Sequence, residues 1–294
     1  MTSTIVADGP LPPGHLLGER YRIDRHLGSG GMGRVYAACQ LASGRLVALK
    51  VMNDEHMADP HIVARFQREG QVMSQLRHPN IVEVFDQGQA DGRWFLAMEL
   101  LRGENLADAI AERKTYEPPD AVPVLAAILD ALDAAHTHQI VHRDLKPENV
   151  FLARPDEGLP AVKVLDFGVA KVVGMSAQDQ LTRSGTVVGT PEFMSPEQAT
   201  GTKVDARSDL YAVGCIAYAM LCGRPPFVDN WPMRVVMKQA FEAHTPPSRV
   251  RPTLAGAAHA DAFVARALEK EPERRYQTAG EMRTALEGLA ERRP

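Results

Sequence analysis

The sequence predicts an α+β protein in which a β-rich N-terminal lobe is followed by a mainly helical C-terminal lobe. Between residues 19 and 100, short runs rich in β-branched and aromatic residues alternate with turn signals. After Gly103 the apolar residues recur at helical spacing instead. The chain has 294 residues, of which 45% are hydrophobic and 24% charged, a composition typical of a soluble globular protein with about two domains.

The β-rich part is predicted to open with three antiparallel strands over residues 21–27, 34–39 and 45–52. A glycine cluster and the turn Ser43-Gly44 separate them. Apolar residues at helical spacing predict one helix over residues 60–76, which His78-Pro79-Asn80 ends. Two further strands are predicted over residues 81–86 and 93–100.

The helical part shows four apolar periodic segments, at residues 122–132, 209–221, 260–268 and 278–289. The run from Leu210 to Gly223 is shorter than the ~18 residues that a membrane-spanning helix needs, so we interpret it as a buried core helix. Residues 1–18, rich in proline and glycine, are predicted to form a flexible tail.

Charge and cysteine usage exclude several classes of protein. The net charge of −4 argues against a protein that binds nucleic acid or a membrane surface through an excess of basic residues. Cys39, Cys215 and Cys222 lack metal-ligand spacing, and we expect buried, reduced thiols in the cytoplasm. No basic region precedes an apolar run at the N-terminus, so no signal peptide is expected.

A glycine-rich segment, Gly28-Ser29-Gly30-Gly31-Met32-Gly33, fits a pattern that also occurs in dinucleotide-binding turns. That interpretation requires a helix after the last glycine, whereas residues 35–39 are β-prone and lead into a turn. Arg34-Val35 occupies the positions where a P-loop would carry Lys-Ser/Thr. A hairpin is therefore predicted, with glycines because backbone N–H groups without Cβ atoms can approach phosphate oxygens closely.

The segment His142-Arg143-Asp144-Leu145-Lys146-Pro147-Glu148-Asn149 carries the strongest functional signal. Asp166-Phe167-Gly168 follows about 20 residues later. Together they supply a base, a cation and two metal-binding side chains, which are the groups that phosphoryl transfer from a metal-bound nucleotide to a hydroxyl needs. The full combination is far more specific than Asp-Phe-Gly alone.

These motifs resemble those of eukaryotic-like bacterial serine/threonine protein kinases, and the resemblance extends from about Tyr21 to about Ala290. The segments at residues 27–36, 77–82 and 194–198 are similar to bacterial versions of the family's motifs. The resemblance implies a bilobal protein-kinase-like fold over residues 19–290, with an N-lobe at about 19–98, a hinge at about 99–102 and a C-lobe at about 103–290. It also implies transfer of the γ-phosphoryl of MgATP to protein Ser/Thr hydroxyls. Mn²⁺ could replace Mg²⁺ as the metal ion in this reaction.

The resemblance implies a role for each residue of the catalytic segment. Asp144 would accept the proton of the substrate hydroxyl, and Lys146 would neutralise charge on the transferring group. Asn149 and Asp166 would hold the metal. Lys146-Pro147-Glu148 is similar to the serine/threonine version of this loop, and Thr190 would face the substrate.

The resemblance also implies a nucleotide site. Lys50 would be held by Glu69 against the α- and β-phosphates. Met98 matches the gatekeeper, and residues 99–101 would offer backbone groups to the adenine. The implied nucleotide-binding residues are Leu27, Gly28, Ser29, Gly30, Gly31, Met32, Gly33, Val35, Ala48, Lys50, Glu69, Met98, Glu99, Leu101, Phe151 and Asp166.

Activation by autophosphorylation, with a homodimer acting in trans, is a further expectation from the family. The segment from Asp166 to Glu197 holds three candidate phosphoacceptors, Thr182, Ser184 and Thr186, and Arg143 would receive the phosphate. Three structural expectations accompany it. Glu197 should pair with Arg275 in the interior, Asp209 should hold the catalytic-loop backbone, and an apolar spine should comprise Met73, Val84, His142 and Phe167.

Two other functional classes compete with this interpretation. A nucleotide-binding scaffold would signal by conformation without transfer, but Lys50, Asp144, Asn149 and Asp166 are all present. A small-molecule kinase on a related fold would not need the peptide-binding surface that residues 189–197 indicate.

Overall fold

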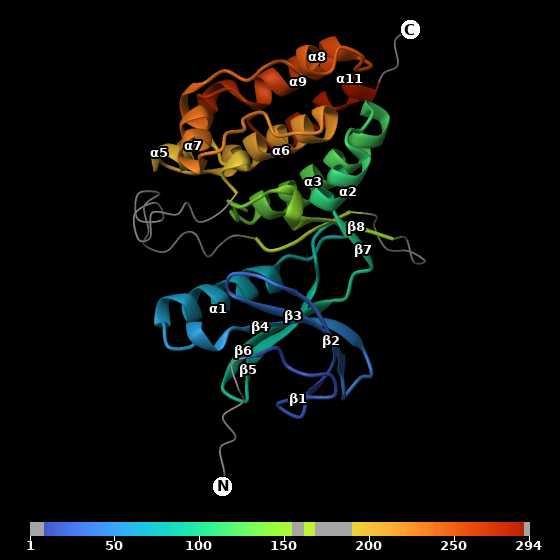
Figure 1. Cartoon of the computed structure of the whole chain (residues 1–294), viewed down its shortest axis with the longest axis vertical. Helices are drawn as coiled ribbons and strands as arrows, with labels where there is room; N and C mark the ends of the chain where they lie inside the picture. The colour runs from blue at the N-terminus through green and yellow to red at the C-terminus, as the bar shows by residue number, and fades with distance from the viewer. Residues whose placement is uncertain (1–8, 155–161, 168–189, 291–294) are drawn as a thin grey trace. The chain divides into compact units, whose positions relative to one another are not determined.

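The computed structural model describes residues 9–154, 162–167 and 190–290. The chain divides into two compact units (Figure 1). The first comprises residues up to Arg77 together with Val82–Arg102, and the second comprises His78–Ile81 and the residues from Gly103 on. The predicted succession of a β-rich N-terminal part and a mainly helical C-terminal part is confirmed.

The first unit is built on a six-stranded sheet in the order β1-β2-β3-β4-β6-β5. Its strands are β1 (Leu16–Leu17), β2 (Tyr21–Ser29), β3 (Gly33–Gln40), β4 (Leu46–Met52), β5 (Val84–Ala90) and β6 (Arg93–Glu99). All neighbouring strands pair antiparallel, so the three predicted opening strands are confirmed. Helix α1 (Pro60–Gln75) packs on β5 and β6. Its N-cap is Asp59, whose carboxylate accepts the N–H of His61 and Ile62.

A hydrophobic cluster of this unit includes residues of the predicted flexible tail. Leu11 and Leu17 are buried beside Ile23, Tyr36 and Phe95. The Leu11 N–H donates to the Tyr36 hydroxyl at 3.1 Å, and β1 pairs with β2. The part of the predicted tail after residue 8 therefore packs against the sheet. The burial of its apolar side chains outweighs the low propensity of this proline- and glycine-rich segment to form regular structure.

The fifth strand begins later than predicted. Ile81 forms a parallel bridge with Val164 and belongs to the second unit, and β5 runs instead from Val84 to Ala90. Residues 91 and 92 close the β5–β6 hairpin with positive φ angles of 50° and 78°, the geometry of a tight primed turn.

The second unit is mainly helical and carries a three-stranded sheet, β7 (Gly103–Asn105), β8 (Val150–Ala153) and β9 (Val162–Val164), in that order. Its helices are α2 (Leu106–Arg113), α3 (Pro118–Thr137), α5 (Pro196–Thr200), α6 (Ala206–Cys222), α7 (Pro232–Phe241), α8 (Pro247–Val250), α9 (Ala257–Ala267), α10 (Ala279–Ala285) and α11 (Glu287–Ala290). The helix predicted over residues 278–289 is thus divided at Leu286.

Helix α6 is the centre of the second unit. Every residue from Ser208 to Leu221 is buried, which confirms the predicted core helix. It packs against α3 and α9, and a Cβ on Gly214 would lie 2.6 Å from the Cβ of Ala267, so the close approach of α9 requires glycine there. Within the described ranges, no helix has the length and apolar character needed to cross a membrane.

Candidate active site

The predicted catalytic segment lies between α3 and β8, and Asp209 at the N-terminal end of α6 fixes its backbone. The carboxylate of Asp209 accepts the N–H of His142 at 2.8 Å and that of Arg143 at 2.9 Å. It also accepts Nε2–H of His136 at 2.8 Å. Arg143 has a φ of 65°, a left-handed conformation that costs a non-glycine residue energy and that these bonds stabilise.

His142 joins the catalytic segment to the segment that carries Asp166. Its Nε2 lies 3.0 Å from the Leu165 carbonyl, and its Nδ1 accepts the Asp144 N–H at 3.3 Å. A carbonyl only accepts and an amide N–H only donates, so the ring is a neutral imidazole with its hydrogen on Nε2. Burial lowers the pKa of His142 below its ordinary value, in agreement with a neutral ring. The ring also packs on Phe167, with centroids 4.7 Å apart.

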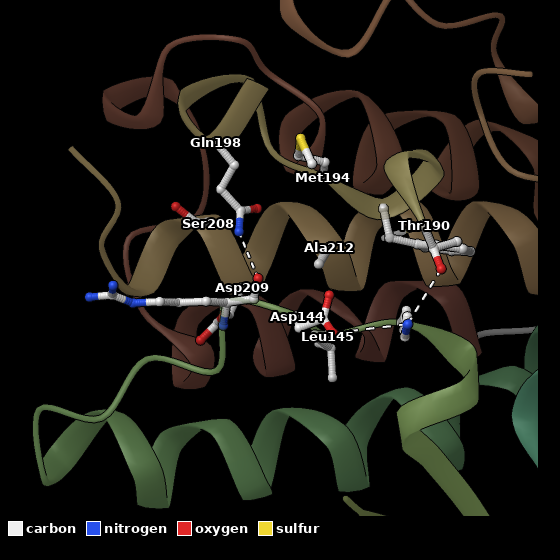
Figure 2. A pocket seen from close by; sticks show the side chains of 11 residues that line it. Asp144, Leu145, Thr190, Met194, Gln198, Ser208, Asp209 and Ala212 are labelled. Atoms are coloured by element: carbon white, nitrogen blue, oxygen red, sulfur yellow. Dashed lines mark hydrogen bonds and ion pairs between the residues drawn. The ribbon is translucent and has the colours of Figure 1, made fainter. Parts of the chain in front are cut away.

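Asp144 and Lys146 line a pocket together with Thr190 (Figure 2). The Lys146 ammonium lies 3.9 Å from the Asp144 carboxylate and donates to the Thr190 hydroxyl at 3.4 Å. Both side chains keep part of their surface exposed, so the pocket offers a carboxylate and a cation to an incoming group. Two of the predicted catalytic residues and the predicted substrate-facing threonine therefore meet at one pocket.

Asn149 and Asp166 are brought together by the pairing of β8 with β9. Val150 is in register with Val164, and the Leu165 N–H donates to the Asn149 carbonyl at 2.8 Å. Asp166 is the next residue. The Asn149 amide donates through Nδ2 to the Asp144 carbonyl at 2.8 Å, so its side-chain oxygen remains as an acceptor. The donors at this place are a carboxylate and an amide oxygen, which suit a hard divalent cation.

A buried ion pair joins α5 to the segment after α9. Arg275 donates to both oxygens of Glu197 at 2.8 and 2.7 Å, with side chains 0% and 5% exposed. Ser208 donates to the same carboxylate. Burial alone would raise the pKa of Glu197, but the bonds and charge of Arg275 outweigh it and lower that pKa below its usual value. The pairing expected from the sequence is present.

Lys50 and Glu69 form a short ion pair in the first unit. Lys50 lies on β4 and Glu69 on α1, and the Lys50 ammonium is 2.7 Å from the Glu69 carboxylate. The side chains are only 12% and 7% exposed. The contact between these two residues matches the prediction, and its role toward a nucleotide stays a prediction.

The glycine-rich segment connects β2 to β3 as the predicted hairpin, with no helix after it. A Cβ on Gly33 would lie 2.4 Å from the Val51 carbonyl, so the neighbouring strand requires glycine at that position. Gly28 and Gly31 have ordinary φ angles, and a Cβ on either would meet nothing within 4 Å. Because nothing described around Gly28 and Gly31 requires glycine, their absent side chains leave room for a group that approaches the backbone from outside.

The residues expected around an adenine ring come from both units. Ala48 is in register with Met98, and both are buried in the first unit's sheet. Val35 is in register with Lys50, and Glu99 ends β6. Phe151 lies half-buried on β8 of the second unit. Met73 is buried in the first unit and Val84 is half-buried there, and the proposed spine through them stays a prediction.

Three residues of the site were missed in the sequence. His136 supplies the third donor to Asp209, and Ser208 the third donor to Glu197. Gln198 donates to the Arg143 carbonyl at 2.7 Å and closes a capping box with Ser195. The Ser-x-x-Gln spacing signals that box in the sequence, whereas the contacts of His136 and Ser208 depend on distant chain segments. Thr182, Ser184, Thr186 and Gly168 lie outside the described residues.

Comparison with known proteins agrees with the family resemblance of the sequence motifs. The family model described as "Protein kinase domain" matches residues 21–286. The chain is 41% identical over 275 residues to serine/threonine-protein kinase pkn2 of Myxococcus xanthus, covering 94% of this chain and 33% of that protein. It is 39% identical over 283 residues to the probable serine/threonine-protein kinase PknB of Corynebacterium glutamicum, covering 94% and 43%. The chain thus spans less than half the length of either relative.

A solved structure is similar over almost the whole chain. The crystal structure of the Mycobacterium tuberculosis PknI kinase domain aligns with a TM-score of 0.73 and 28% sequence identity. The alignment covers 96% of this chain and 100% of that one. The likeness therefore extends to the order of the elements that carry the site.

Proposed function

This chain belongs to the protein kinase family, among its eukaryotic-like bacterial serine/threonine members, and we propose that it transfers the γ-phosphoryl of MgATP to serine or threonine hydroxyls of proteins. The observation that carries the proposal is the pocket of the second unit, where Asp144, Lys146 and Thr190 meet. The carboxylate and the ammonium there are the two charges that in-line transfer to a hydroxyl requires.

On the acceptor side, Asp144 orients the substrate hydroxyl and takes its proton as the oxygen attacks. Lys146 neutralises charge on the transferring group from a position 3.9 Å away from the Asp144 carboxylate. Thr190, which accepts from Lys146, faces the substrate at the edge of the same pocket. These are proposed roles, and the distances within the second unit support them.

On the metal side, Asn149 and Asp166 hold Mg²⁺, with Mn²⁺ as an alternative. A bound divalent cation supplies positive charge that offsets the negative charge of the phosphates. The oxygen donors of these two residues fit such an ion, and the remaining ligands would come from water and the nucleotide. The bonds from Asn149 to Asp144 and from Leu165 to Asn149 fix the acceptor and metal residues relative to each other within the second unit.

On the nucleotide side, the ammonium of Lys50, oriented by Glu69, binds the α- and β-phosphates. The hairpin glycines approach the phosphates through backbone N–H groups. Gly28 and Gly31 support this role because a Cβ there would meet only open space in the described structure. Val35, Ala48, Met98 and Phe151 form the apolar surroundings of the adenine, and residues 99–101 bind its edge.

Regulation is proposed to act through the segment after Asp166. Phosphorylation of Thr182, Ser184 or Thr186 would add roughly −1.5 to −2 charges, which Arg143 receives through charge-assisted hydrogen bonds. The backbone of Arg143 supports this assignment, since Asp209 holds its N–H and Gln198 its carbonyl. A fixed backbone presents the guanidinium at little entropic cost.

A second copy of the chain is the proposed partner for phosphorylation in trans. Helix α7 exposes Met233, Met237 and Phe241 by 46%, 53% and 69%, at successive turns of one helical face. An antiparallel copy centred on Met237 would place Met233 opposite Phe241, and it would bring Arg234 near the copy's Glu242. An exposed apolar stripe that can face its own copy in this way supports the proposal of a twofold pairing.

The cytoplasm is the proposed compartment, because the three free thiols of Cys39, Cys215 and Cys222 are stable under reducing conditions.

The proposed activity is tested with γ-labelled ATP, Mg²⁺ and two classes of acceptor, a set of proteins and a set of metabolite alcohols. Transfer to protein serine and threonine, with phosphosites mapped by mass spectrometry, is expected. Transfer only to metabolites would favour a small-molecule kinase, and MgATP binding without transfer would favour the scaffold. Phosphosite mapping of the chain itself tests the autophosphorylation proposal at the same time.

A further inference from the structure

A histidine outside the predicted site contacts the tip of the glycine-rich hairpin. His56 lies at the end of the short 3-10 helix η1 (Asp54–His56), which follows β4 directly. Its Nε2 is 2.7 Å from the carbonyl oxygen of Gly31. Because a carbonyl oxygen only accepts hydrogen bonds, Nε2 carries the hydrogen and donates it.

The position of His56 is itself fixed within the first unit. Arg93, at the start of β6, donates to both carboxylate oxygens of Asp54 at 2.7 and 2.5 Å. The His56 N–H closes a turn on the Asn53 carbonyl at 3.1 Å. An ion pair with two parallel bonds therefore holds η1 to the sheet, and the imidazole projects from a rigid element.

Two consecutive carbonyls of the hairpin tip are held by the segment from Asn53 to His56. His56 binds the Gly31 carbonyl, and the Asn53 N–H binds the Met32 carbonyl at 3.1 Å. No cis peptide bond occurs among the described residues, so each of these peptide planes is trans. In a trans peptide the N–H points opposite to the C=O. The Met32 N–H is therefore turned away from His56, toward the other side of the hairpin tip.

This arrangement matters because the glycines of the tip carry no side chain, so that backbone bonds, between Gly30 and Gly33 and from Asn53 to Met32, are its other restraints in the described structure. A Cβ on Gly31 would meet nothing within 4 Å, so no packing on that side of the residue orients the peptide between Gly31 and Met32. Glycine backbone is also the most flexible in the chain. The imidazole of His56 supplies a side-chain restraint on the orientation of that N–H.

We infer that His56 is a positioning residue for nucleotide phosphates, which it affects by holding the Gly31–Met32 peptide with its N–H turned outward. The inference rests on the proposed function, in which the N–H groups of this hairpin bind phosphate. His56 does not itself contact the nucleotide. Its loss leaves the apolar adenine surroundings intact and weakens only the binding of phosphates.

The experiment compares three variants of the full chain with the wild type. His56→Ala removes the donor, and His56→Gln keeps one, because the glutamine Nε2 reaches about as far as that of histidine. His61→Ala is the matched control, because His61 is an exposed histidine of the same unit whose side chain makes none of the hairpin contacts. Calorimetric titration gives the dissociation constants of MgADP and of adenosine, and kinetics give KM for MgATP and kcat.

His56→Ala is expected to raise the dissociation constant of MgADP and the KM for MgATP about 3- to 10-fold, the effect of one net hydrogen bond. Its adenosine affinity and thermal midpoint should match those of the His61→Ala control. His56→Gln should recover most of the MgADP affinity. This split between phosphate-bearing and phosphate-free ligands would not arise from general destabilisation.

The inference is overturned if His56→Ala binds MgADP as the wild type does, or if it loses adenosine affinity in equal measure. It is also overturned if His56→Gln behaves like His56→Ala. A wild-type chain that binds no nucleotide would instead overturn the proposed function, so the two failures are distinguishable.

Discussion

Asp209 of α6 and Arg143 of the catalytic segment are joined by a 2.9 Å hydrogen bond from the Arg143 N–H to the Asp209 carboxylate. Arg143 has a φ of 65° at this point, and Asp144, the proposed base, follows it. The same carboxylate accepts from His142 and His136. One buried charge thus fixes the backbone direction from which the Asp144 side chain enters the pocket.

Asp209→Asn should reduce turnover about 10- to 100-fold, because the amide keeps one acceptor oxygen and turns its NH₂ group toward backbone N–H groups that also donate. The catalytic segment would then lose the position that turnover requires. The stability loss should be about 1.5–3 kcal/mol, the range for bonds to a charged group. MgATP affinity should change less than about twofold. Steady-state kinetics, calorimetric titration and urea unfolding measure these quantities. Asp130→Asn, in an exposed pair with Arg283, is the control, and an equal fall in its turnover would contradict the account.

Arg275→Met should destabilise the second unit by about 3–5 kcal/mol, because it leaves the Glu197 carboxylate buried without its cation. Arg274→Ala removes an arginine one residue away, whose pair with Glu271 is 66% and 60% exposed, and should cost less than about 1 kcal/mol. Denaturant unfolding of both variants separates the two cases. Similar losses for both would show that burial of the pair is not what stabilises it.

Much of the site could be predicted because short motifs fix the local chemistry. The pair of Lys50 with Glu69 and the contact of Asp209 with the catalytic loop are expected from the resemblance to the protein kinase family, and both contacts are present. The glycine-rich hairpin followed from the β-prone residues after Gly33. The hairpin depends on the immediate sequence, which is what pattern reasoning uses. Asp209 and His142 lie 67 positions apart, and only the family resemblance connects them.

Contacts between distant segments that no family motif marks were not predicted. Leu11 looked like part of a tail, since its burial against the sheet is not visible from neighbouring prolines and glycines. Ile81 was assigned to β5 because its pairing with Val164 lies 83 positions away in the sequence. A local signal for the true strand was nevertheless present, since Asp91-Gly92 is a strong hairpin turn and places β5 immediately before it.

Stability should fall as the pH decreases below about 6.5, through the titration of His142. Burial lowers the folded-state pKa of this ring, so between that pKa and the unfolded value of about 6.5 the unfolded chain binds more protons. The stabilising contribution is therefore complete above pH 6.5 and is lost on acidification. His142→Phe should have a lower free energy of unfolding but a shallower dependence on pH between 7.5 and 5. An unchanged slope would show that His142 does not titrate in this way.

Met237→Lys should shift the chain toward the monomer, because a charge at the centre of the α7 stripe would face its own copy. Leu41→Lys is the control, since Leu41 is an apolar residue of the first unit with 44% exposure. Sedimentation equilibrium over a range of concentrations measures the association. Equal association of both variants and the wild type would contradict the self-pairing of α7.

The central claim is that Asp144 acts on the acceptor hydroxyl while Asp166 acts on the metal-bound nucleotide. The most direct test measures single-turnover phosphoryl transfer and MgATP affinity side by side for Asp144→Asn and Asp166→Asn. Asp144→Asn should lose about 10²–10⁴-fold in the transfer rate and keep its MgATP affinity. Asp166→Asn should weaken MgATP binding, because the charge that holds the metal is lost. Near-wild-type transfer by Asp144→Asn, or equal MgATP affinities in the two variants, would contradict the claim.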